Sequence, residues 1–87
     1  MIKFVLCDDS QNILDKLSIM LNDIFKEEKF DAIVEYTTTS TSSMLEYLTN
    51  HKIDVIILDI NINTNKDGLK LAESLRKLNK RTYIIFS

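Results

Sequence analysis

Four polar residues stand directly after mostly apolar segments of this chain. Asp8 and Asp9 follow residues 1–7, Asp59 follows residues 53–58, and Ser87 follows residues 82–86. Three carboxylates within a few ångströms of one another repel, and a divalent cation relieves that repulsion. Oxygen ligands without His or Cys favour Mg²⁺ or Mn²⁺, which in proteins also hold substrate phosphate. These residue types therefore predict a metal site suited to phosphoryl chemistry.

The predicted chemistry gives each residue a role. With a cation shielding its charge, one carboxylate can attack phosphorus and form an aspartyl phosphate. A hydroxyl such as that of Ser87 can then donate a hydrogen bond to a phosphoryl oxygen. Each residue also has an ordinary structural interpretation, because Asp8 and Asp9 can cap a helix and Asp59 can be a turn residue. Their joint placement at one edge of a sheet favours the chemistry.

The elements that position these residues can be predicted from hydrophobic periodicity. Strand-forming apolar runs occupy four segments: residues 1–7, 32–39, 53–59 and 82–87. Helical patterns occupy three segments between them: residues 10–26, 39–52 and 67–78. Strict alternation of strand and helix predicts an α/β fold with a doubly wound parallel sheet and right-handed crossovers. Such a sheet binds ligands at the carboxyl ends of its strands.

Several single residues have simpler predictions. Ser43 and Glu46 have the spacing of a capping box, which predicts a helix start near Ser43. Cys7, the only cysteine, cannot form an internal disulfide and is expected to be a small buried hydrophobe. His51, the only histidine, lies in the polar segment TNHK and is expected at the surface, without a second His or Cys to support a metal site.

Length and composition limit the class of protein. With 87 residues, 45% of them apolar and 28% charged, the chain allows one ordered domain. A net charge of −2 gives no basic field for nucleic acid. The apolar stretches are much shorter than the roughly 20 residues that cross a membrane, and no signal-peptide cleavage region is present. A cytoplasmic protein without membrane contact is expected.

The motifs taken together resemble one family over the whole chain. FVLCDDS, an amphipathic helix, VIILDI, DGLKLAESLRK and YIIFS are similar to the receiver domain of bacterial two-component response regulators. The resemblance implies a flavodoxin-like (CheY-like) sheet with strand order 2-1-3-4. It also implies that a sensor histidine kinase transfers a phosphoryl group to Asp59, and that the protein is no enzyme beyond slow loss of that group.

The resemblance also implies the roles of the site residues. Asp8 and Asp9 match the acidic pair that holds Mg²⁺ (or Mn²⁺) together with Asp59. The backbone carbonyl of Asn61 matches a further metal ligand. Ser87 matches the hydroxyl residue that turns towards the phosphoryl group on activation.

The sequence departs from the usual receiver pattern in two respects, and the first concerns the loop after Asp59. The loop NINTNK after Asp59 lacks the common proline and is one residue longer than usual, which is similar to the accessory gene regulators and their LytTR-type relatives. Such regulators control transcription through a DNA-binding output domain, so nucleic acid would be contacted only through that missing domain.

The second departure is the length. Receivers run to five strands and five helices, and the lysine and aromatic of strand five and the last two helices have no counterpart here. Residues 1–87 are therefore expected to be the N-terminal part of a receiver domain. The fourth strand, TYIIF, would be an exposed edge through which the fragment can self-associate.

Three alternatives stay open on the residues alone. The run from Asn63 to Gly68 has EF-hand spacing at its first six positions, but Ser74 stands where a bidentate Glu is needed. A phosphohydrolase of the haloacid dehalogenase type also uses a strand-end Asp, but it needs an acid at the position of Asn61. A receiver-like interaction module that is never phosphorylated is the third alternative.

Overall fold

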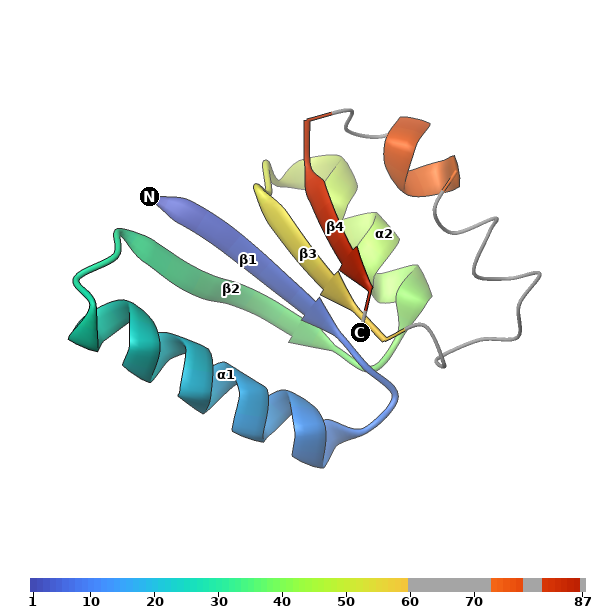
Figure 1. Cartoon of the computed structure of the whole chain (residues 1–87). Coiled ribbons are helices and arrows are strands. Elements are labelled where there is room, and N and C mark those ends of the chain that lie inside the picture. Colours follow the sequence, from blue (N-terminus) through green and yellow to red (C-terminus); the bar gives the residue numbers. More distant parts are fainter. Residues whose placement is uncertain (60–72, 78–80, 87) are drawn as a thin grey trace.

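The computed structural model describes residues 1–59, 73–77 and 81–86, which form a parallel sheet with helices on both faces (Figure 1). The elements follow in this order: β1 (Ile2–Cys7), α1 (Gln11–Glu27), β2 (Ala32–Thr38), α2 (Thr41–Asn50), β3 (Val55–Leu58) and β4 (Tyr83–Phe86). All strand pairs are parallel, and the order across the sheet is β2-β1-β3-β4. This confirms the predicted α/β class and the strand order 2-1-3-4.

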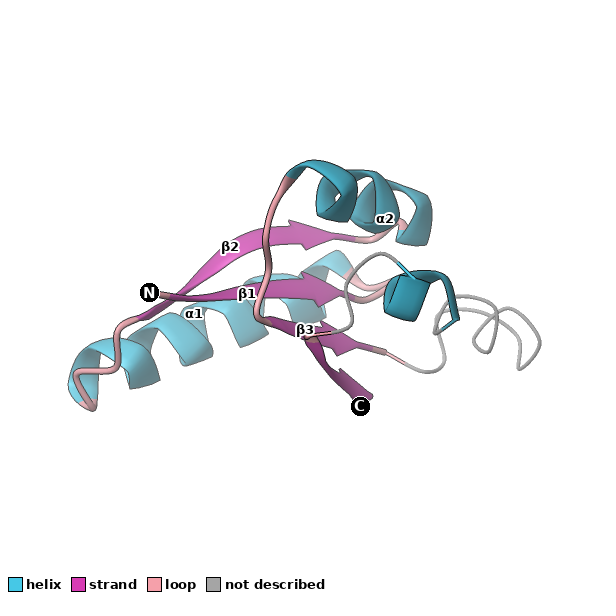
Figure 2. Ribbon diagram, turned by 90° about the horizontal axis from the view of Figure 1, so that it is seen from above, coloured by secondary structure: helices cyan, strands magenta, loops and turns pink. Residues whose placement is uncertain are grey.

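The helices form separate layers. Helix α1 lies along β1 and β2 on one face, and α2 lies on the other face (Figures 1 and 2). Residues 73–77 are helical and pack on the α2 side, because Leu75 belongs to the same buried cluster as Met44 of α2. The third predicted helix is thus present over 73–77, and the rest of its predicted range lies outside the described residues.

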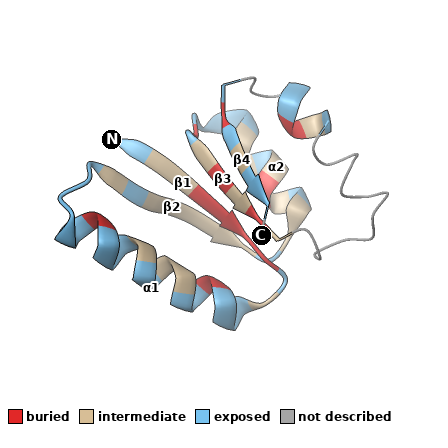
Figure 3. Ribbon diagram, viewed as in Figure 1, coloured by how far each residue is buried: buried red, intermediate tan, exposed pale blue. Residues whose placement is uncertain are grey.

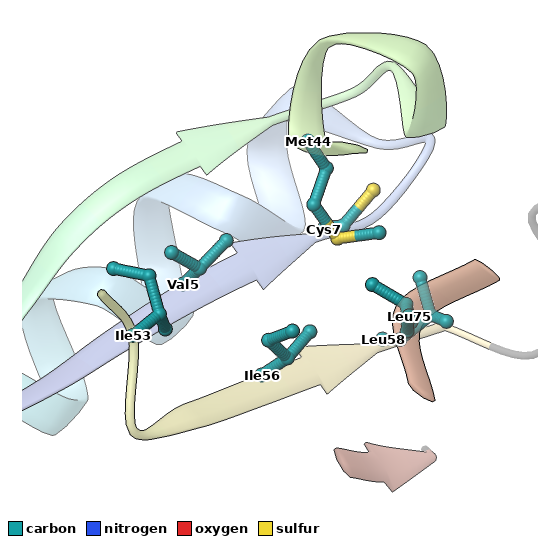
Figure 4. Close-up of a cluster of buried hydrophobic side chains, with 7 residues drawn as sticks. All are labelled: Val5, Cys7, Met44, Ile53, Ile56, Leu58 and Leu75. Atoms are coloured by element: carbon teal, nitrogen blue, oxygen red, sulfur yellow. The ribbon is translucent and has the colours of Figure 1, made fainter. Parts of the chain in front are cut away.

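The larger part of the core lies between the sheet and α2 (Figures 3 and 4). Its buried members come from β1, α2, β3 and the segments beside them: Val5, Cys7, Met44, Ile53, Ile56, Leu58 and Leu75. Side chains alternate between the faces of a strand, so Val5 and Cys7 reach this cluster and Leu6 points to the α1 face. Cys7 is 1% exposed, as expected of a buried hydrophobe.

The α1 face buries a second, smaller set. Leu14 and Phe25 are the buried residues of α1, and the Phe25 ring lies 5.0 Å from that of Phe4 on β1. The apolar stripe of the helix predicted over residues 10–26 is only partly covered, since Ile13 and Met20 are about half exposed at 49% and 51%. The sheet face therefore contacts the flank of the stripe that carries Leu14 and Phe25.

The start of α2 differs from the capping-box prediction. Ser40, not Ser43, is the N-cap residue, and its hydroxyl accepts a hydrogen bond from the backbone N–H of Ser43. The Ser40 N–H itself donates to the hydroxyl of Thr38, the last residue of β2. The prediction was wrong because this short turn directs the chain into the helix three residues earlier.

Hydrogen bonds to residues just before β3 hold β4 in place. The buried Thr82 hydroxyl donates to the carbonyl of Ile53 at 2.7 Å, and the Tyr83 N–H donates to the carbonyl of Asp54 at 2.9 Å. Arg76 donates to the carbonyl of Thr82 at 3.0 Å. These contacts set the register of β4 on β3. The parallel pairing then continues to the carboxyl ends of both strands.

No helix within residues 1–59, 73–77 and 81–86 has the length and apolar character that a membrane span requires.

Candidate functional site

The site is built where β1 and β3 end side by side. Cys7 pairs with Leu58 in the parallel register, so the next residues, Asp8 and Asp59, are neighbours. The Asp59 N–H donates to the Cys7 carbonyl at 3.0 Å, and the Asp8 N–H donates to the carbonyl of Thr38 at 3.2 Å. The backbone of both residues is therefore fixed by the sheet, and only their side chains lie beyond the strand ends.

Three carboxylates meet at this edge. One oxygen each from Asp8, Asp9 and Asp59 lies within 4.8 Å of the others. Asp8 is 8% exposed, Asp59 is half-buried and Asp9 is exposed, so the cluster extends from the protein interior to the solvent. Asn61 and Ser87, the other predicted site residues, lie outside the described residues, and their roles stay predictions.

A local turn orients Asp8. Its Oδ1 accepts the backbone N–H of Ser10 at 2.9 Å, and the Ser10 hydroxyl in turn accepts the N–H of Ile13 as the N-cap of α1. Asp8 thus supports the helix start with one carboxylate oxygen and also belongs to the cluster. This link was not predicted from the sequence, although an Asp two residues before a helix-capping Ser is a recognisable signal of such a turn.

The donor set fits a hard divalent cation. The cluster offers carboxylate oxygens, and Mg²⁺ in proteins is held by one or two carboxylates together with water and phosphate. The nearby thiol of Cys7 is no competing ligand, because it is buried in the cluster beneath α2. Burial and the charges of Asp8 and Asp59 raise the pKa of Cys7 from 9.0 to about 11, so the thiol stays protonated near neutral pH.

His51, in contrast, lies away from this edge. It is exposed at the end of α2, as the sequence predicts, and stacks on Tyr47. No other histidine exists in the chain, so the candidate metal centre has oxygen ligands alone among the residues that the structure describes.

A doubly wound parallel sheet with an acidic cluster at the carboxyl ends of its central strands is typical of domains that handle a cation and a phosphate there. The family model of the response regulator receiver domain matches residues 4–87, nearly the whole chain, and the chain belongs to this family. The four-stranded fold is consistent with the flavodoxin-like, CheY-like receiver architecture. The comparison with curated proteins gives no match.

Membership of the family establishes the general role. Receiver domains act as phosphoacceptors in two-component signalling, interact with histidine kinases and bind Mg²⁺ at an acidic pocket. They are generally not enzymes. The acidic cluster of this chain lies at the sheet edge where such a pocket is expected.

Proposed function

We propose that Asp59 accepts a phosphoryl group from the phosphohistidine of a sensor histidine kinase, and that Asp8 and Asp9 hold Mg²⁺ together with it. The observation that carries the proposal is the meeting of three carboxylates within 4.8 Å at the ends of β1 and β3, in a chain of the receiver family. Asp59 is proposed as the acceptor because it directly follows the central strand β3 and matches the phosphoacceptor position of the receiver pattern.

The transfer is a displacement at phosphorus. A carboxylate oxygen of Asp59 forms the new bond to phosphorus while the bond to the donor nitrogen breaks, and the departing imidazole keeps the electron pair. Bound Mg²⁺ would offset the negative charge that the carboxylates and the phosphoryl oxygens bring together. The protein contributes position: the Asp59 N–H donates to the Cys7 carbonyl, and the Ser10 N–H donates to one oxygen of Asp8.

Two further residues complete the proposed site. The backbone carbonyl of Asn61 would be an additional metal ligand, and the Ser87 hydroxyl would donate a hydrogen bond to a phosphoryl oxygen. Their sequence positions support these roles, because Asn61 follows Asp59 by two residues and Ser87 directly follows β4. A Ser87 contact would connect phosphorylation to a shift between two conformations of the domain.

The wider setting is proposed from the resemblance of the loop after Asp59. The receiver domain would pass its signal to a LytTR-type output domain, which contacts DNA and regulates transcription. The cytoplasm, where sensor kinases transfer phosphoryl groups, is the proposed location. Tyr83, Ile85 and Phe86 on the outer strand β4 are 74%, 49% and 48% exposed, which supports self-association of this chain through β4.

The phosphoacceptor role can be tested with a small donor. The chain is incubated with acetyl phosphate and Mg²⁺, and its intact mass is measured. One added phosphoryl group is expected in the wild type and in the control Asp23→Ala, which changes an exposed Asp of α1. Asp59→Ala should give no adduct, and removal of Mg²⁺ with EDTA should abolish the adduct of the wild type.

Other outcomes identify the alternatives. No adduct in the wild type would contradict the proposal and favour a receiver-like interaction module. An adduct that persists in Asp59→Ala would exclude this residue as the acceptor. Release of phosphate over many turnovers from phosphate esters would instead indicate a phosphohydrolase.

A further inference from the structure

A column of three aromatic rings lies on the α2 side of the sheet, away from the acidic cluster. Tyr36 of β2 stacks on Tyr47 of α2 with ring centres 4.1 Å apart and planes 1° from parallel. Tyr47 stacks in turn on His51, at 3.8 Å and 6°. Only parts of these rings belong to the hydrophobic core, since Tyr36 and Tyr47 are half-buried and His51 is exposed.

An irregularity in β2 makes the column possible. Phe4 pairs with Val34 and Val5 pairs with Tyr36, so Glu35 is an extra residue in the strand. Such a bulge allows consecutive side chains to point to the same face. Tyr36 consequently packs against the cluster beneath α2, and Glu35 reaches the same helix.

Glu35 holds the central ring of the column in place. One of its carboxylate oxygens accepts the Tyr47 hydroxyl at 2.8 Å, and the other lies 3.6 Å from the Lys3 ammonium. Partial burial and this hydrogen bond raise the pKa of Tyr47 to about 12, so the phenol stays protonated and continues to donate. Both faces of the Tyr47 ring are covered, by Tyr36 and by His51, so the ring face that a ligand can reach is the outer face of the exposed His51.

His51 offers an acceptor beside the rings. Its Nδ1 lies 3.0 Å from the Tyr47 carbonyl. A carbonyl oxygen only accepts, so Nδ1 carries the proton, and Nε2 of the neutral ring is left as an acceptor.

A cavity of about 310 Å³ opens beside the column. It is lined by the three rings and by three polar side chains of α2: Ser43, Glu46 and Asn50. Its volume is at the small end of the range for ligand pockets, which suits one side chain or a small metabolite. No lysine or arginine is among the described residues that line it, and the Glu46 carboxylate has no hydrogen bond or ion pair within the described part of the chain.

We propose that this cavity binds a guanidinium group. A guanidinium is flat and stacks on aromatic rings, unlike an ammonium, and it presents several N–H donors in one plane. The cavity supplies the outer face of the exposed His51 ring for stacking, together with acceptors at Glu46, His51 and Asn50, so both properties of the group are used. The source is either an arginine side chain of a partner protein or a small guanidino compound.

The test is a titration of the ¹⁵N-labelled chain with N-acetyl-arginine methylamide, followed by NMR. Shifts are expected at Tyr36, Tyr47 and His51, with saturation at millimolar ligand, because few groups hold the ligand in an exposed site. The neutral isostere N-acetyl-citrulline methylamide should bind at least fivefold more weakly. Equal binding of both ligands, or no saturable shift with the arginine analogue, would overturn the proposal.

Matched variants locate the binding. Glu46→Gln and His51→Ala change exposed residues, and each is expected to weaken binding about two- to fivefold, the value of one exposed charge or cation–π contact. Glu27→Gln, which makes the same charge change at the end of α1, should bind like the wild type. Unchanged binding in both cavity variants would contradict the assignment.

The source of the guanidinium follows from one more comparison. A short peptide with a central arginine that binds more than tenfold more tightly than the isolated analogue indicates a partner segment that contacts the rim. Binding equal to that of the analogue indicates a small guanidino compound.

Discussion

Replacing Asp8 with Asn separates the charge of the acidic cluster from its geometry. Asp8 is 8% exposed, and its Oδ1 accepts the Ser10 N–H at 2.9 Å. Asparagine keeps an oxygen at that position, so the turn before α1 can persist. What is lost is one negative charge within 4.8 Å of the oxygens of Asp9 and Asp59.

The size of the effect follows from Coulomb's law. Two unit charges 4.8 Å apart repel by about 0.9 kcal/mol in water and by about 3.5 kcal/mol at an effective dielectric constant of 20. Because Asp59 is half-buried and Asp9 is exposed, the lower value is the better guide. The Asp8 charge takes part in two such pairs, with Asp9 and with Asp59. Without metal, Asp8→Asn should therefore be more stable than the wild type by about 2 kcal/mol, or about 8–16 °C in Tm.

Mg²⁺ should make the wild type more stable than Asp8→Asn. A cation that binds only the folded wild type adds about 2.7 kcal/mol of stability at 100 times its Kd. Asp8→Asn has lost a ligand and should gain much less. Thermal unfolding followed by circular dichroism, first in EDTA and then at rising MgCl₂, should show the two Tm curves crossing. Asp23→Asn, with the same charge change on the exposed surface of α1, should follow the wild type.

Two results would refute this reasoning. A wild type whose Tm does not respond to Mg²⁺ would mean that the cluster holds no cation in this chain. An Asp8→Asn variant less stable than the wild type in EDTA would mean that the Asp8 charge is compensated within the fold rather than repelled.

Three further predictions follow from single contacts. Thr82→Val should lower the free energy of unfolding, measured in urea, by about 1–3 kcal/mol, because the Ile53 carbonyl loses a buried 2.7 Å hydrogen bond. Thr82→Ser keeps the hydroxyl and should lower it less. Equal stability of Thr82→Val and the wild type would contradict this prediction. The folded-state pKa of Tyr47, about 12, lies above its ordinary 10.0, so protonated Tyr47 stabilises the fold below about pH 10 and this contribution is lost between pH 10 and 12. The stability difference between wild type and Tyr47→Phe should shrink over that range, and a constant difference would argue against the Glu35 bond. Cys7 has a pKa of about 11 instead of 9.0, so about a hundredfold less of it is thiolate near neutral pH. A disulfide reagent should therefore react slowly with the folded protein and faster after urea unfolds it. Fast reaction of Cys7 in the folded protein would contradict its burial.

The parallel sheet and the meeting of the acidic residues could be predicted because both follow from strong, long-range constraints, whereas the strand order was implied by the resemblance to receiver domains. Apolar runs such as residues 55–58 fit a strand covered on both faces, and parallel topology brings the carboxyl ends of β1 and β3 to one edge. Asp8 and Asp59 are 51 positions apart in sequence, yet the register fixes them as neighbours.

Details that depend on competition between neighbouring residues for the same structural role could not be predicted. Hydroxyl residues fill the segment 37–43, and each can cap a helix, so only the turn from Thr38 decides that Ser40 does. The extra residue Glu35 leaves no sign in the sequence of β2, because one charged residue between Val34 and Tyr36 also fits a regular strand. The stack of Tyr36 on Tyr47 depends on this bulge and was missed for the same reason.

The most direct test of the central claim is to locate the phosphoryl group chemically. After reaction with acetyl phosphate and Mg²⁺, borohydride reduces an aspartyl phosphate to homoserine, and peptide mass spectrometry identifies the position. The account predicts homoserine at position 59 and unmodified Asp8 and Asp9. Homoserine at another position, or an Asp59 that is unmodified after full reaction, would contradict it.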